Sequence, residues 1–186
     1  LRTALSTGGG TALVRWRDDL GADGVTWVVQ GSTDGASWSD LATTTALFAE
    51  VDSYPHLRVR ALRDGVLSSP SDSYGATGGD WLVVDGFDRV LGGSYAEFTH
   101  GFAARVGSAL GAPFSTASNE AVISGAVDLA DYDRVLWLLG DESSADGTLD
   151  ADERAAVEAY LDGGGRIVVS GSEFGYATDA TWLEDV

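Results

Sequence analysis

Oxygen-bearing residues in one acidic segment follow the spacing of a calcium-binding loop. Such a loop takes ligands from positions 1, 3, 5, 7, 9 and 12, and it needs a glycine at position 6 for a sharp turn. Gly147 occupies that turn position when the loop is counted from Glu142. The ligand positions then hold Glu142, Ser144, Asp146, Thr148 (through its carbonyl), Asp150 and Glu153. Calcium at this loop is one interpretation of the segment, and we expect no other cofactor.

The second half of this segment can also be explained without a metal. Asp150 and Glu153 form a capping-box pair, in which Asp150 accepts from first-turn amides and Glu153 reaches back to the Asp150 N–H. Both charges favour the positive N-terminus of a helix. Position 1 holds Glu where Asp is usual, and the preceding residues have a strand pattern rather than a helical one. Helix capping is therefore the favoured interpretation.

Acidic residues also follow three segments that are predicted to be buried strands. Asp85 and Asp88 follow "WLVV", Glu142 follows "VLWLLG", and Glu173 follows "RIVVSG". The carboxyl ends of parallel strands meet at one edge of a sheet, where functional groups collect. Converging carboxylates can hold a divalent metal or form an acid/base pair of the glycosidase kind. These four residues are the catalytic candidates of the sequence, although capping and solvation are the favoured explanation.

The sequence lacks the residue patterns of several other common catalytic and cofactor-binding sites. The chain has no cysteine, and Ser170 and Ser172 are not part of a G-x-S-x-G elbow. The only imidazole bases are His56 and His100, neither of which follows a predicted parallel strand. The glycine patterns of dinucleotide-binding and P-loop proteins are also missing.

The charge of the chain restricts its partners. The formal net charge is −18, and all eleven basic residues are arginines. Such a chain repels phosphate backbones and anionic lipid headgroups, so we expect neither nucleic acid binding nor membrane insertion. Trp38, beside the Asp34–Gly35 turn, is the tryptophan that we would test as a carbohydrate platform, because most of the others have strand patterns typical of a core.

The first part of the chain has the pattern of short strands. "TALVRW" and "HLRVRAL" alternate apolar with polar residues, and Asp-Gly turns occur at 34–35 and 64–65. This pattern favours a small β-sandwich. The motifs "VRW", "STDGASWSDL", "LRVRAL" and "SSPSDSYGA" resemble a bacterial fibronectin type III domain over residues 1–76, with Trp16 as its buried tryptophan. The corner tyrosine of that family falls at Pro55, one position after Tyr54.

After "TGGD" (residues 77–80), which we interpret as a linker, strand and helix patterns alternate to residue 186. Strands are predicted over 81–87, 134–140 and 166–171, and helices over 95–110, 119–127 and 150–162. This alternation predicts a three-layer α/β domain with a mostly parallel sheet.

The motifs "VVDGFDRV", "SNEAVISGAVDLADYDRVLWLLGDES" and "VVSGSEFG" are similar to a Rossmann-like domain related to class I glutamine amidotransferases. The resemblance implies a domain that is incomplete at its C-terminus and lies in a secreted multidomain bacterial protein, outside the cell or in the periplasm. Parent proteins of this kind are labelled peptidoglycan amidases or golvesin-like xanthan lyases. The amidotransferase nucleophile, a cysteine, has no counterpart here.

The favoured function is a non-catalytic accessory or binding module of a protein that acts on cell wall or polysaccharide. Its expected partners are the other domains of the parent chain and a cell-wall glycan or polysaccharide. One alternative is a hydrolase or metal-dependent enzyme that uses the strand-end carboxylates. Another is a calcium-stabilised structural module.

Overall fold

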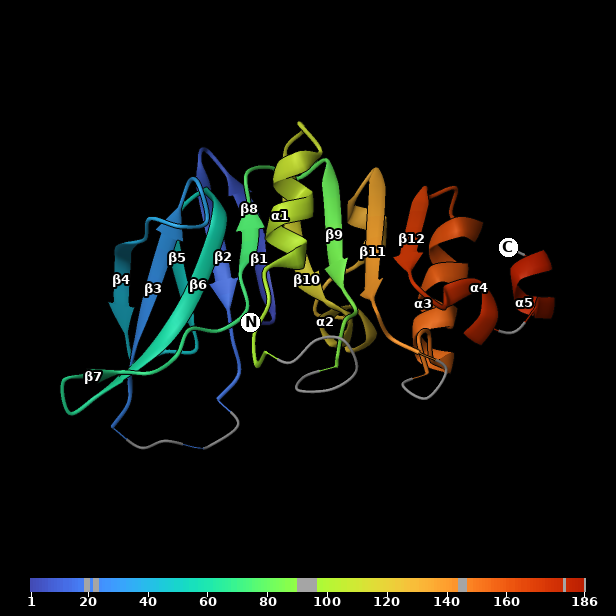
Figure 1. Ribbon diagram of the computed structural model, residues 1–186. Coiled ribbons are helices and arrows are strands. Elements are labelled where there is room, and N and C mark those ends of the chain that lie inside the picture. The colour runs from blue at the N-terminus through green and yellow to red at the C-terminus, as the bar shows by residue number, and fades with distance from the viewer. Residues whose placement is uncertain (19–20, 22–23, 90–96, 144–146, 179, 186) are drawn as a thin grey trace.

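A five-stranded antiparallel sheet and a seven-stranded mixed sheet, with a few helices, make up the protein (Figure 1). The computed structural model describes residues 1–18, 21, 24–89, 97–143, 147–178 and 180–185. The strands of the first part are β1 (Thr3–Gly8), β2 (Thr11–Arg15), β3 (Thr26–Ser32), β4 (Ser39–Thr44), β5 (Phe48–Asp52), β6 (Tyr54–Arg63), β7 (Val66–Leu67) and β8 (Tyr74–Ala76). Strands β4, β3, β6 and β7 form the five-stranded sheet together with β8, which pairs with β6.

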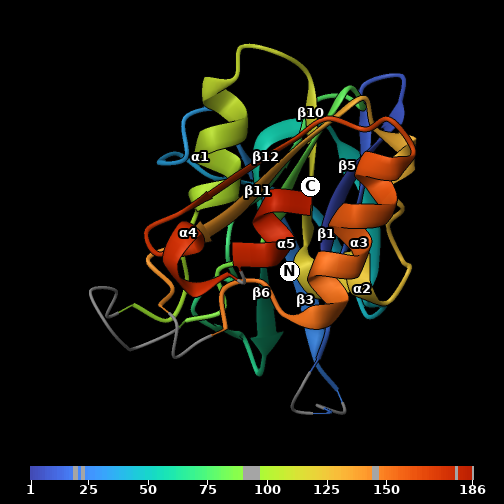
Figure 2. The same ribbon diagram turned by 90° about the vertical axis from the view of Figure 1, so that its right-hand side faces the viewer.

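Four parallel strands form one end of the larger sheet. They are β9 (Trp81–Asp85), β10 (Phe114–Ser118), β11 (Arg134–Gly140) and β12 (Ile167–Gly171), in the order β12-β11-β9-β10. The helices are α1 (Phe102–Ala109), α2 (Asn119–Ile123), the 3-10 turn η1 (Leu129–Asp131), α3 (Ala151–Asp162), α4 (Phe174–Ala177) and α5 (Ala180–Asp185). Figure 2 shows α1 on one side of the strands and α2 and α3 on the other. None of the helices in the described ranges is long and apolar enough to cross a bilayer.

The larger sheet joins the two halves of the chain. β1 pairs antiparallel with β10 through Thr3 opposite Ala117 and Ala4 opposite Thr116, and β2 and β5 continue the sheet beyond β1. Strands from before and after residues 77–80, the segment that connects β8 to β9, therefore belong to one sheet. The expected combination of antiparallel strands with an α/β layer is confirmed, and the larger sheet is mixed because β1 aligns against β10.

Two apolar clusters cover opposite faces of the seven-stranded sheet. One contains Trp16, Leu57, Tyr74 and Phe114, so it packs residues of both halves together. The other contains Trp137 and the inner faces of α2 and α3. Alternate residues of β11 enter different clusters, because successive side chains of a strand point to opposite faces.

Several elements differ from the sequence-based prediction, among them α2, which ends at Ile123 rather than at residue 127. β10 was not predicted, since its buried residues are mostly small and polar, as in "FSTAS". α1 begins at Phe102 rather than at residue 95. Residues 90–96 lie outside the described ranges, and the residues just before α1 are not helical. There the His100 N–H is donated to the Asp72 carboxylate at 2.8 Å instead of to a helical carbonyl.

Candidate functional site at the carboxyl ends of the parallel strands

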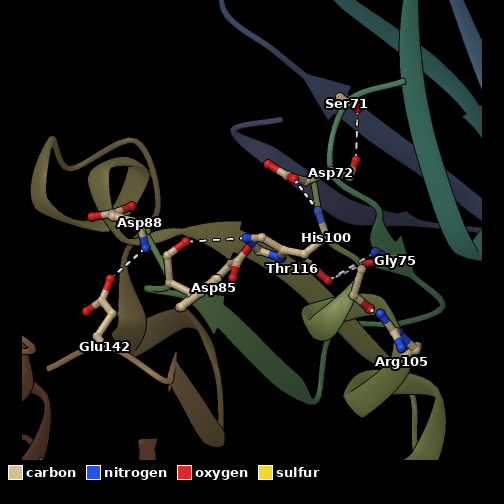
Figure 3. Close-up of polar contacts among 11 residues, drawn as sticks. Ser71, Asp72, Gly75, Asp85, Asp88, His100, Arg105, Thr116 and Glu142 are labelled. Carbon is tan, nitrogen blue, oxygen red and sulfur yellow. Dashed lines mark hydrogen bonds and ion pairs between the residues drawn. The ribbon is translucent and has the colours of Figure 1, made fainter. Parts of the chain in front are cut away.

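The strand order places a topological switch point between β9 and β11. The chain passes from β9 to β10 on one side and from β10 to β11 on the other, and ligands of open α/β sheets bind just beyond such a point. Glu142 follows β11 here, and it is buried. Its Oε1 accepts a hydrogen bond of 2.6 Å from the backbone N–H of Asp88, which follows β9 (Figure 3). The chain's own carboxylate thus binds an N–H group at the switch point.

Two glycines allow the ends of β9 and β11 to approach one another. A Cβ on Gly86 would lie 2.5 Å from the Trp137 Nε1, and a Cβ on Gly140 would lie 2.5 Å from the Phe87 ring. Gly140 also has a φ of +58°, which favours glycine. The loops after both strands are therefore held close to the core.

A buried asparagine links the other side of Asp88 to helix α3. The Asn119 Nδ2 donates to Asp88 Oδ2 at 3.0 Å and to Glu153 Oε1 at 2.9 Å. Burial raises the pKa of both carboxyls, and the Asn119 amide partly offsets this rise. Glu153 also accepts from the Asp150 N–H, so this chain of hydrogen bonds connects β9, α2 and the start of α3.

Asp85, the last residue of β9, faces a different group of residues. Its Oδ2 lies 3.8 Å from His100 Nδ1, and both side chains are buried. The opposite nitrogen of the imidazole, Nε2, lies 3.3 Å from the Phe87 carbonyl oxygen. Burial, reinforced by the charge of Asp72, raises the pKa of Asp85 well above its usual range, and burial lowers the pKa of His100. Burial therefore favours the uncharged form of both the acid and the imidazole.

This environment predicts how stability depends on pH. When folding raises the pKa of an acid, the free energy of unfolding of the protein falls as pH rises from the unfolded-state pKa of that acid through its folded-state pKa. Asp85→Asn removes that loss while keeping the shape of the side chain. The free energy of unfolding of the variant, relative to the wild type, is expected to increase between pH 4 and pH 8 in urea titrations. The exposed Asp52→Asn is the control, and a pH-independent difference for Asp85→Asn would contradict the assignment.

All four predicted catalytic carboxylates lie at or just after the ends of parallel strands, at the same end of the sheet, but they have different contacts. Asp88 and Glu142 meet through a backbone N–H, whereas Asp85 faces His100. Glu173 is the residue before α4, and its side chain does not cap that helix. Within the described ranges, no group of three or more His, Asp or Glu side chains is close enough to hold a metal ion.

The predicted calcium loop is only partly within the described residues. Ser144 and Asp146 lie outside them. Asp150 and Glu153 form the full capping box, with Asp150 Oδ1 accepting from the N–H groups of Asp152 and Glu153. Thr148 is buried beside them. Helix capping thus occupies two of the six predicted ligands, and calcium binding by the loop stays a prediction.

The candidate nucleophiles and the candidate bases contact different groups, and no hydrogen bond joins a serine of β12 or its following loop to a histidine among the described residues. Ser172 donates to the Glu142 carbonyl at 3.4 Å, and Ser170 lies on an exposed face of β12. His100 faces Asp85, while His56 Nε2 lies 3.5 Å from Ser108 Oγ on α1.

Sequence reasoning missed Asn119, Asp72 and Tyr74 as members of this region. Asn119 directly follows β10, so recognition of that strand would have placed it at the same sheet edge as Asp85 and Asp88. Asp72 and Tyr74 come from the first half of the chain, and no local signal relates them to β9. Both act on Asp85 in the structure, Asp72 through its charge and Tyr74 through its hydroxyl.

Comparisons with known proteins do not assign the site. No protein-family model matches the chain, and no curated protein or solved structure matches it.

Proposed function

We propose that this chain is a non-catalytic accessory and binding module of a secreted bacterial protein that acts on cell wall or polysaccharide. The observation that supports the proposal is that the carboxylates after the parallel strands accept hydrogen bonds from the chain's own N–H groups. Glu142 binds the Asp88 N–H, and Asp88 and Glu153 share the Asn119 amide. Carboxylates that accept hydrogen bonds from the chain's own N–H groups stabilise the fold, and those oxygens are then not free to bind a substrate.

At a finer level, we propose a fibronectin type III-like sandwich followed by a Rossmann-like domain of the amidotransferase-related kind. Strand order supports the first part, since β1-β2-β5 and β4-β3-β6-β8 follow the A-B-E and C′-C-F-G arrangement of fibronectin type III sheets. The order β10-β9-β11-β12 supports the second, because it is the 2-1-3-4 order of doubly wound sheets. The sequence has no cysteine to serve as the amidotransferase nucleophile.

The proposal predicts binding without turnover. Purified protein is mixed with peptidoglycan sacculi and with neutral and carboxylated polysaccharides, and retained protein and new reducing ends are measured together. Saturable retention with no increase in reducing ends is expected. Release of reducing ends that Glu142→Gln or Asp85→Asn abolishes, with retention unchanged, would contradict the proposal and support a hydrolase.

A further inference from the structure

A cleft of about 380 Å³ lies where the five-stranded sheet meets the segment that leads into α1. We call it the junction cleft. The side chains of Trp38, His56, Arg58, Ser73, His100 and Arg105 line it. The first four come from the first half of the chain, whereas His100 and Arg105 come from the second. The packing of the two halves therefore creates the cleft, and its volume is within the range of ligand-binding pockets.

Two arginines, Arg58 and Arg105, are the groups of this cleft that can bind an anion. The net charge of the chain is −18, and the cleft also contains the carboxylates of Asp34 and Glu97. Among the described residues, neither Arg58 nor Arg105 forms an ion pair with a carboxylate. Arg58 Nε donates to Gln30 Oε1 at 2.8 Å, and Arg105 Nε donates to the Gly101 carbonyl at 3.3 Å. Each guanidinium is thus positioned by a neutral oxygen rather than by a carboxylate.

Among the described residues, neither carboxylate of the cleft is in an ion pair with Arg58 or Arg105. Asp34 Oδ1 accepts from the N–H groups of Ala36 and Ser37 and from the Ser32 hydroxyl, so that carboxylate closes its own turn. Those bonds hold the pKa of Asp34 far below its usual range. Glu97 is exposed at the rim. An anion entering the cleft therefore meets two guanidinium groups that no carboxylate pairs with, as well as the charges of Asp34 and Glu97.

Aromatic and buried polar groups give the cleft a fixed shape. The Arg58 guanidinium lies 3.9 Å from the centroid of the Trp38 ring, a stacking distance that orients both side chains. The His56 imidazole is buried against the Asp34–Gly35 turn, where a Cβ on Gly35 would lie 3.3 Å from it. This arrangement suits a sugar acid, because the face of the Trp38 ring that Arg58 does not cover can pack against sugar C–H groups while the guanidinium binds the carboxylate.

We propose that the junction cleft binds a carboxylate-bearing sugar residue of an acidic polysaccharide, with Arg58 and Arg105 on the carboxylate and Trp38 against the sugar ring. The proposal rests on the function proposed above, since it names the ligand class of a binding module. A neutral glycan lacks the group that the guanidiniums would bind, and an acidic peptide lacks the ring that Trp38 would contact.

Paired ligands test the carboxylate directly. Isothermal titration calorimetry is performed with oligogalacturonate and oligoglucuronate, each beside its methyl-esterified form, and with poly-glutamate. The free acids are expected to bind, with each ester weaker by about tenfold or more because it loses charge-assisted hydrogen bonds. Arg105→Gln and Arg58→Gln are each expected to weaken binding of the acids by about tenfold, and Trp38→Ala to weaken binding of acids and esters alike.

Arg134→Gln is the matched control, since Arg134 also lies over a tryptophan ring, Trp81 at 5.3 Å, away from the cleft. Unchanged circular dichroism spectra establish that each variant is folded, and Arg105, exposed on α1, remains informative if Arg58→Gln unfolds. Equal binding of acids and esters would overturn the carboxylate assignment and leave the binding module intact. Equal binding of poly-glutamate would overturn the sugar assignment. Binding of no ligand would overturn the inference, while cleavage of a bound acid would overturn only the non-catalytic function.

Discussion

Replacing Phe114 with Ala is expected to lower the free energy of unfolding by about 3–5 kcal/mol, the usual cost of removing a fully buried phenylalanine ring. Phe114 begins β10, and only 1% of its surface is exposed. Its ring lies where Gly75 of β8 and Gly107 of α1 leave no room for a Cβ, so it fills the space between the two halves. The cavity left by the variant would be enclosed by both.

Urea denaturation followed by tryptophan fluorescence and by circular dichroism measures this effect. The two signals are expected to give one coincident transition in the wild type and in Phe114→Ala, because β1 and β10 pair in one sheet and one apolar cluster contains residues of both halves. Phe48→Ala is the control, since half of the Phe48 surface is exposed and the expected change is below about 1 kcal/mol. Two separate transitions would show that the halves fold independently.

Asn119→Ala is expected to cost about 2–3 kcal/mol at pH 7, because it leaves two partly buried carboxylates without the amide that they share. The effect depends on pH. The pKa values of Asp88 and Glu153 are already raised by burial, and the loss of the amide would raise them further. Both carboxyls become protonated as pH falls, so the destabilisation is expected to shrink toward pH 4.

The measurement is the urea midpoint of Asn119→Ala from pH 4 to pH 8. The neighbouring Glu120→Ala is the control, since its side chain is half exposed and pairs with Arg2 at the surface, where an ion pair contributes at most about 1 kcal/mol. A cost for Asn119→Ala that does not change with pH would show that the amide contributes through packing and not through the two carboxylates.

Some helices and strands could be predicted because their sequence signals lie within the element itself. The strands β9, β11 and β12 and the capped helix α3 follow from apolar runs and from Asp150 and Glu153. The prediction that β12 is buried was wrong, because β12 is an edge strand on which Val168 is 57% exposed. β10 could not be recognised in this way, because Ser115, Thr116 and Ser118 are buried polar residues whose hydroxyls bond to neighbouring segments. Its pairing with β1 joins residues more than a hundred positions apart, and no local pattern encodes it.

The sequence predicted which carboxylates lie at the candidate site, but it did not predict the groups that they contact. Parallel-strand geometry brought Asp85, Asp88 and Glu142 to one sheet edge, as the alternation of strands and helices indicated. Their partners come from a missed strand, in the case of Asn119, and from the first half of the chain, in the case of Asp72. The junction cleft has the same origin, since Arg58 and Arg105 meet only when the two halves pack.

The sign of the stability change in Glu142→Ala tests the central claim most directly. Residues kept for catalysis or ligand binding often cost stability, so their removal tends to stabilise a protein, whereas removal of a structural carboxylate destabilises it. We predict that Glu142→Ala lowers the free energy of unfolding by about 1–3 kcal/mol in urea titrations, because the Asp88 N–H loses its acceptor and the buried Glu142 side chain is removed. Glu50→Ala, at an exposed position of β5, is expected to change it by less than about 0.5 kcal/mol. An increase in stability for Glu142→Ala would contradict the structural role and point to a functional carboxylate at the switch point.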